Sequence, residues 1–325
     1  MNKNPISLTA IRGFHIGGEQ IKLTGQPIRE MTKVVGAPAL RVDMNGDHWV
    51  GQLYCQHFEQ TSKGFAYPVI LMHGGGLTGA CWENTPDGRE GWLNHFLRER
   101  YELYVCDAFE RGRASWPPFP QVLPDAPEHR PLDAVWHHFR FGPADSYISG
   151  QCEKTAYPGQ LFPVSHLSTF GQQFVPRWAG TDRKSLNAYG ALIESIGPCL
   201  LIGHSQGAYY AMELATQYPD LIKGVVAIEP PAVPAATATG NHEDMNILPP
   251  HLAVWGDFIH GKNATWQGYL KGCERYFSVL KKTCPISRLD ELPELGIQGN
   301  SHMMMLDKNS DIIAAHIQKW IQSIV

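Results

Sequence analysis

The pentapeptide Gly-His-Ser-Gln-Gly at 203–207 is the stretch of the chain best suited to chemistry. An apolar run, CLLI at 199–202, leads into it, and a helical pattern, AYYAMELATQY, follows it. Glycines on both sides of a serine permit the sharp strand-to-helix turn that lifts the hydroxyl out of the strand end. This context favours a nucleophilic Ser205 over an ordinary turn that carries a solvated serine.

A serine hydroxyl is a poor nucleophile until a base takes its proton. When the nucleophile, the acid and the histidine follow one another in this order along the chain, the base lies near the C-terminus. His302, in the segment GIQGNSHMMML, directly precedes the predicted terminal helix and fits this position. The other fourteen histidines suit the role less well; His242, for example, precedes the last predicted strand. We therefore predict that His302 is the base, against the alternative of a loop histidine without chemistry.

The imidazole needs a carboxylate that fixes its tautomer and stabilises the imidazolium. Two candidates follow predicted strands: Glu229 in GVVAIEPP, next to the nucleophile's strand, and Asp257 in LAVWGDF. Both positions can reach a loop above Ser205, so position and chemistry alone do not separate them. For Glu229, a surface carboxylate at a strand exit is a further alternative.

The segment HGGG at 73–76 ends the strand before the first crossover and predicts an oxyanion hole. Acyl transfer builds negative charge on the carbonyl oxygen, and backbone N–H groups usually stabilise that charge. Glycines let the backbone approach without a β-carbon. We expect the N–H groups of Gly75 and Gln206 to form the pair. The alternatives are a glycine hinge or a phosphate loop, although the Lys-Ser/Thr of a phosphate loop does not follow.

Short apolar runs separated by helical patterns predict a mostly parallel α/β sheet, because strands covered on both faces are nearly continuously apolar. The N-terminal part predicts antiparallel hairpins instead. Its segment ALRVDMNGDHWVGQL places Asn45-Gly46 between alternating runs, which is a strong hairpin signal. The predicted strands of the parallel part lie in YPVILM, YELYVCD, CLLIGH, GVVAIEP and LAVWGD.

The stretch 112–185 interrupts this alternation and is rich in proline and aromatic residues, as in RASWPPFPQVLPDAPEHRP. Loops of this length in compact proteins are usually functional. We therefore predict a cap inserted at 112–185 into a core formed by 1–111 and 186–325, rather than an irregular loop without a role in binding.

The composition is that of a globular enzyme, with 43% hydrophobic and 18% charged residues and a net charge of −4. No basic block suggests nucleic-acid binding, and no apolar run approaches the ~20 residues that span a bilayer. The N-terminus lacks an apolar signal-peptide core. The seven cysteines show no metal-finger spacing, so we expect free thiols in a reducing compartment. We expect a cytoplasmic location, with a removed leader as the alternative, and a serine mechanism that needs no metal or cofactor.

Taken together, the motifs resemble the atypical serine esterases of the α/β-hydrolase superfamily, typified by a bacterial esterase with a Ser-Glu-His triad. The similarity runs from about Phe14 to the final helix. The segments that carry it are HGGGLTGACWENTPDGREGW (73–92), FRFGP (139–143), HSQG (204–207), AIEP (227–230) and GNSHMMM (299–305).

The resemblance implies the α/β-hydrolase fold and assigns the triad acid to Glu229, which leaves Asp257 a structural role. It carries Ser205 and His302 over as nucleophile and base, and Gly75 and Gln206 as oxyanion donors. Some relatives have cysteines at the positions of Gly75 and Gly76, and this chain does not.

The sequence thus predicts a serine carboxylesterase acting on small to medium, partly apolar esters. A lactonase, an acyl-transferring cyclase or a C–C bond hydrolase with the same triad is the alternative, and a non-catalytic ligand-binding relative is a remoter one. We expect a small-molecule ester as partner, no nucleic acid and no membrane, and a homodimer as an option.

Overall fold

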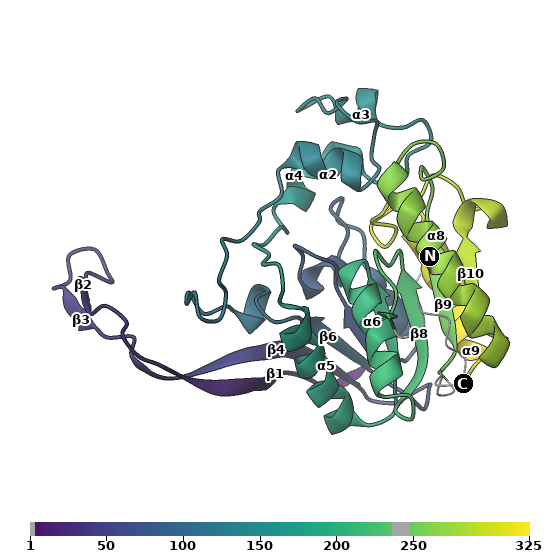
Figure 1. Cartoon of the computed structure of the whole chain (residues 1–325). Helices are drawn as coiled ribbons and strands as arrows, with labels where there is room; N and C mark the ends of the chain where they lie inside the picture. Colours follow the sequence, from purple (N-terminus) through teal and green to yellow (C-terminus); the bar gives the residue numbers. More distant parts are fainter. Residues whose placement is uncertain (1–3, 236–247) are drawn as a thin grey trace.

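The computed structural model describes residues 4–235 and 248–325. Its centre is an eight-stranded sheet in the order β1-β4-β6-β5-β7-β8-β9-β10, in which β5 to β10 are parallel and β1 and β4 are antiparallel (Figure 1). Its strands are β1 (Leu8–Leu23), β4 (Gly46–Gln60), β5 (Val69–Met72), β6 (Leu103–Asp107), β7 (Cys199–His204), β8 (Ile222–Ile228), β9 (His251–Trp255) and β10 (Arg288–Glu291).

The predicted parallel strands are confirmed, and all residues of β5, β6, β7 and β9 are buried. β10 escaped prediction because its sequence, RLDE, is polar and half-exposed at the sheet edge. Since the parallel strands run the same way, the residues that follow β5, β7, β8 and β9 meet at one edge of the sheet.

Helices cover both faces of the sheet, and each face has its own apolar cluster (Figure 1). α1 and α9 contribute to one cluster, and α5, α6 and α8 contribute to the other. α9 buries Ile313, Ile317 and Trp320. The bounds are α1 (Trp92–Arg98), α5 (Asp182–Ile196), α6 (Gln206–Gln217), α8 (Ala264–Thr283) and α9 (Ser310–Gln322), with a 3-10 turn η1 (Gly79–Trp82) and another, η5 (Leu292–Leu295).

The N-terminal part is antiparallel, but the hairpin predicted at Asn45-Gly46 is wrong. β1 and β4 pair along their whole length, with Leu23 opposite Gly46, and extend as an arm beyond the body of the molecule (Figure 1). The short strands β2 (Arg29–Met31) and β3 (Leu40–Val42) pair at its tip. The Asn45 side chain bonds the backbone N–H and C=O of Gln26 across the arm, so Asn45 joins the two chain segments there instead of turning the chain.

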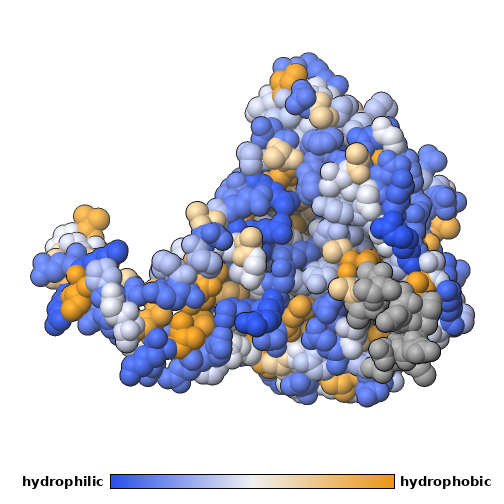
Figure 2. Space-filling view, viewed as in Figure 1, coloured by the Kyte–Doolittle hydropathy of each residue, from blue (hydrophilic) through white to orange (hydrophobic). Residues whose placement is uncertain are grey.

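The arm carries exposed apolar side chains, which Figure 2 shows as orange patches along it. The exposed aliphatic side chains of the arm are Ile28, Met31, Val34, Val35 and Leu40, and Trp49 is exposed as well.

The proline-rich segment between β6 and α5 forms short helices beyond the sheet edge at which the parallel strands end (Figure 1). α5 begins at Asp182, within the predicted cap, and packs on β1 and β4 of the core. The short elements are η2 (Gly112–Ala114), α2 (Leu132–His138), α3 (Cys152–Thr155), η3 (Val164–His166) and α4 (Leu167–Gly171).

All seven cysteines are free and buried, as expected from the sequence. Within residues 4–235 and 248–325, no helix is both long and apolar enough to cross a bilayer. His242, which the sequence analysis set aside as a base, lies outside the described residues.

Candidate active site

Ser205 stands at the turn between β7 and α6 with a strained backbone, φ 52° and ψ −116°. The turn depends on its glycines. A β-carbon on Gly203 would lie 2.2 Å from the carbonyl oxygen of Gly207, and one on Gly207 would lie 2.4 Å from that of Met72. The Ser205 N–H donates to the Ile228 carbonyl oxygen at 2.8 Å, so the end of β8 fixes the turn. This is the geometry of a nucleophile elbow.

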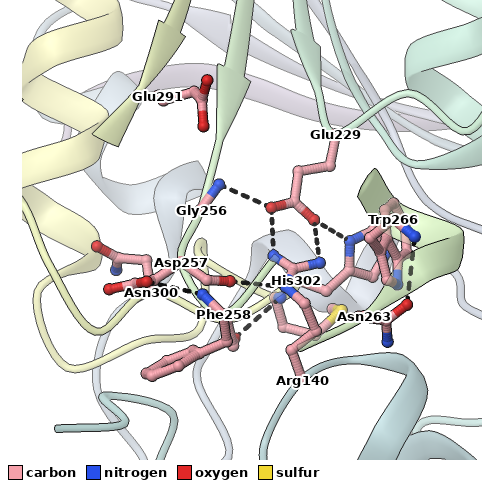
Figure 3. A network of polar contacts seen from close by, with 12 residues as sticks. Arg140, Glu229, Gly256, Asp257, Phe258, Asn263, Trp266, Glu291, Asn300 and His302 are labelled. Atoms are coloured by element: carbon pink, nitrogen blue, oxygen red, sulfur yellow. Dashed lines mark hydrogen bonds and ion pairs between the residues drawn. The ribbon is translucent and has the colours of Figure 1, made fainter. Parts of the chain in front are cut away.

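Glu229 and His302 meet at the end of β8 (Figure 3). His302 Nδ1 donates to Glu229 Oε2 at 2.5 Å, although 73 residues separate the two in the chain. Glu229 Oε1 also accepts the backbone N–H of Gly256 at 2.7 Å. The Glu229 backbone has a positive φ of 47°, a strained conformation of the kind that collects at functional sites. The contact favours the tautomer in which His302 Nδ1 carries the proton and Nε2 is the acceptor nitrogen of the ring.

Arg140 neutralises the buried carboxylate, and sequence reasoning missed it. Its Nη1 donates to Glu229 Oε2 at 2.9 Å and its Nη2 bonds Glu229 Oε1, while its Nε donates to the Asp257 carbonyl oxygen at 2.7 Å (Figure 3). Both side chains of this ion pair are 0% exposed. A buried carboxylate is costly unless it is paired, so the guanidinium explains how Glu229 can end an apolar strand. The available signal was FRFGP, an arginine among apolar residues.

Asp257 does not reach His302 and instead holds the loops around it. Its Oδ1 accepts the Phe258 N–H at 2.7 Å and its Oδ2 accepts the Gly299 N–H at 3.1 Å. Its own N–H donates to the Asn300 carbonyl oxygen at 2.7 Å. Asp257 therefore ties the end of β9 to the loop that carries His302 (Figure 3).

The His302 ring is almost fully buried among other rings. Its centroid lies 4.2 Å from that of Trp266, 4.4 Å from that of His204 and 5.0 Å from that of Phe139. Burial, followed by the positive charge of Arg140, holds the pKa of His302 well below its usual range. A neutral imidazole is the form that can accept a proton from serine.

The glycine loop after β5 is held in place from both sides. The His73 Nε2 accepts the Ala108 N–H at 3.0 Å, and burial lowers the pKa of His73 to about 4, so the ring stays neutral. The Val175 N–H donates to the Gly76 carbonyl oxygen at 3.0 Å and ties the loop to the proline-rich segment. The backbone of Gly75 is thereby fixed beside the elbow.

Gln206 is also fixed. Its side-chain Oε1 accepts from Arg111 Nη2 at 3.3 Å, and its Nε2 donates to Asp182 Oδ1 at 3.2 Å. The buried Glu110 bonds Arg111 and Thr181, which extends the network into the start of α5. These contacts set the first residue of α6, whose N-terminus favours negative charge.

A cavity of about 310 Å³ joins these elements. Ser205, His302, Gly75 and Gln206 all line it, so the structure brings four of the five predicted site residues to one space, with Glu229 behind His302. The rest of the lining is largely aromatic and charged, namely Leu77, Arg130, His138, Phe139, Arg177, Asp182, His204, Tyr209, Pro231, Ala232, Trp266 and Tyr269.

Known proteins resemble this chain in sequence and in fold. The chain is 30% identical to a protein described as a novel bacterial esterase, with a TM-score of 0.81 over 99% of this chain and 98% of that one. It is 25% identical to a probable secreted lipase, phiG, of a fungal species (strain ATCC 74256), over 83% of this chain and 85% of the relative. The model of the alpha/beta hydrolase family matches residues 69–324. The protein is a hydrolase of the carboxylesterase type, and the chain belongs to the alpha/beta hydrolase family.

Proposed function

We propose that this protein is a serine carboxylesterase that hydrolyses small to medium, partly apolar esters through an acyl-enzyme. The observation that carries the proposal is the 2.5 Å contact between Glu229 and His302 beside a cavity that Ser205 also lines. A carboxylate that contacts an imidazole, beside a cavity that a strained serine also lines, supplies the elements of nucleophilic acyl transfer.

In the proposed mechanism, Ser205 attacks the ester carbonyl while His302 Nε2 takes its proton. Glu229 orients the imidazole through Nδ1 and balances the imidazolium charge, and Arg140 pairs with the Glu229 carboxylate. The N–H groups of Gly75 and Gln206 stabilise the oxyanion. The alcohol leaves with the proton from His302, and water then hydrolyses the acyl-enzyme by the same steps.

The walls of the cavity support a partly apolar substrate. Phe139, Trp266 and Tyr269 supply aromatic surface, and apolar walls with a few polar groups are typical of small-molecule sites. Phe139 and His138 come from the segment 112–185, which we propose acts as a cap over the cavity.

The proposal is tested by replacing the nucleophile. In Ser205→Ala, the hydrolysis of p-nitrophenyl esters should fall by about 10⁴-fold or more, because the acyl-enzyme cannot form. The control is Ser168→Ala, which removes an exposed hydroxyl from α4 and should keep full activity. Circular dichroism checks that both variants fold. Substantial turnover by a folded Ser205→Ala would contradict the proposed mechanism.

Partners and location remain predictions. We propose the small-molecule ester as the partner, with no nucleic acid or membrane, and a homodimer as the state to check by light scattering. The cytoplasmic location predicted from the sequence is also still a prediction, and the word secreted belongs to the name of the fungal relative.

A further inference from the structure

The guanidinium group of Arg177 lies against the glycine loop after β5, here called the oxyanion loop because it carries Gly75. The mechanism above does not use this guanidinium. A β-carbon on Gly75 would lie 2.9 Å from Arg177 Nη1 and 3.1 Å from Arg177 Cζ, so the guanidinium lies directly on the glycine backbone. Arg177 is half-buried and lines the same cavity as Ser205. Among the residues that the structure describes, no side-chain hydrogen bond or ion pair reaches this guanidinium.

The acidic side chains near Arg177 already have other partners. Asp182 Oδ1 accepts from Gln206 Nε2 at 3.2 Å and from Tyr210 Oη at 2.6 Å. Glu128 Oε1 accepts from Arg130 Nε at 3.1 Å. Burial, followed by the charges of Arg130 and Arg111, lowers the pKa of Arg177, while Glu128 acts in the opposite direction. A half-buried cation without an ion pair to a carboxylate lacks the negative charge that would stabilise it.

A recess beside the oxyanion loop leads to this cation. It holds only about 10 Å³, and its lining combines Leu77, Val135, Phe139, Phe174 and Val175 with the charged Glu128, Arg130 and Arg177. An acyl chain on Ser205 would therefore lie in the 310 Å³ cavity that Arg177 also lines, with Leu77 and Phe139 in its walls and the guanidinium close to Gly75. A guanidinium binds a carboxylate through two parallel hydrogen bonds, which gives both affinity and orientation.

We propose that Arg177 binds a carboxylate on the acyl part of the substrate, so that the preferred substrates are half esters of short dicarboxylic acids. The inference rests on the proposed esterase function and names its substrate class. Leu77 and Phe139, which line the 310 Å³ cavity with Ser205, supply apolar surface for the methylene groups between the two carboxyl carbons, and Arg177 supplies the charge. The ester is cleaved as proposed above, and the dicarboxylic acid and the alcohol are the products.

The test compares monoethyl succinate with ethyl succinamate, in which a neutral amide replaces the carboxylate at nearly the same shape. The release of ethanol gives kcat/KM for each ester, and the ratio of the two values isolates the charge. We expect the wild-type ratio to favour monoethyl succinate and to fall by about tenfold to a hundredfold in Arg177→Gln, the range for a charged hydrogen bond. Arg183→Gln removes an exposed arginine of α5 and should leave the ratio unchanged.

A wild-type ratio at or below one, or an Arg177→Gln ratio within twofold of the wild type, would overturn the inference. Equal losses of kcat/KM on both esters would leave the ratio unchanged. Arg177 would then be assigned to stabilisation of the oxyanion instead of binding of the carboxylate. Labelling of Ser205 by an organophosphonate shows that the site of Arg177→Gln is intact.

A binding measurement separates this inference from the esterase proposal. Calorimetry on Ser205→Ala should show monoethyl succinate binding that weakens by about tenfold or more when Arg177→Gln is added. Unchanged binding would contradict the carboxylate site even if Ser205 is the nucleophile. Weakened binding together with turnover by Ser205→Ala would contradict the esterase mechanism alone.

Discussion

At the scale of single residues, the candidate site depends on the buried carboxylate of Glu229, which contacts both His302 and Arg140. The elbow and the terminal loop point to Ser205 and His302 through local pattern. Glu229 and Asp257 both follow strands, so the choice between them depends on which carboxylate reaches the ring. In the structure only Glu229 does so, and Arg140, 89 residues away in the chain, neutralises it. No local pattern could predict a contact made by a loop that folds back over that distance.

The acid can be identified by comparing two conservative substitutions. Glu229→Gln keeps the size of the side chain but removes the charge that stabilises the imidazolium, so kcat should fall by about 10⁴-fold. Asp257→Asn keeps a hydrogen-bond acceptor for the Phe258 and Gly299 N–H groups, so we expect a much smaller loss, of about tenfold at most. The measurement is kcat on a neutral ester. A collapse of kcat in the aspartate variant alone would assign the role to Asp257.

The acid limb of the pH profile reports on His302. The imidazole acts as a base only when neutral, and burial with Arg140 holds its pKa well below the usual value of 6.5. A lowered pKa keeps the ring neutral as the pH falls, so kcat/KM should hold down to pH values below 6.5 and be lost only as the pH falls through the lowered pKa. The profile of kcat/KM on a neutral ester measures this. A midpoint at or above 6.5 would show that the ring titrates as an exposed histidine does.

At the scale of elements, short buried strands and glycine turns are predictable, whereas strand pairing is not always so. The five apolar runs became strands because each is buried on both faces. The Asn45-Gly46 signal failed because the strand before it, β3, pairs with β2 while the strand after it, β4, pairs with β1. The alternation of apolar residues and the turn residues are properties of one chain segment. Strand pairing also depends on the other strands with which that segment can form hydrogen bonds.

The elbow predicts a cost for one added methyl group. In Gly207→Ala the β-carbon would lie 2.4 Å from the Met72 carbonyl oxygen and 2.6 Å from that of His73, and these backbone atoms cannot yield as a flexible side chain would. We expect a loss of about 1–3 kcal/mol in the free energy of unfolding, together with lower kcat because the glycine loop after β5 shifts.

Gly268→Ala is the matched control. Gly268 is an exposed residue of α8 with no atom within 4 Å of the added carbon. Alanine should stabilise this helix by about 0.5–1 kcal/mol. Urea denaturation measures both variants. Equal stability of Gly207→Ala and the wild type would mean that α6 and the β5 strand end are farther apart than described.

At the scale of the whole molecule, the fold makes one site from five distant chain segments. The glycine loop after β5, the elbow after β7, the end of β8, the loop before α9 and the segment after β6 all meet at the edge where the parallel strands end. Element order predicts this edge, because parallel strands finish together. The residues of the cavity wall are not predictable in the same way. Several of them belong to the proline-rich segment, whose backbone is mostly irregular.

The most direct test of the central claim is intact-mass labelling by a fluorophosphonate, which reacts with an activated serine. The wild type should gain one adduct, and peptide mapping should place it on Ser205. Ser205→Ala should gain none, and His302→Gln should react far more slowly because the base is missing. An unlabelled wild type, or equal labelling of Ser205→Ala, would contradict the assignment of Ser205 as a nucleophile activated by His302.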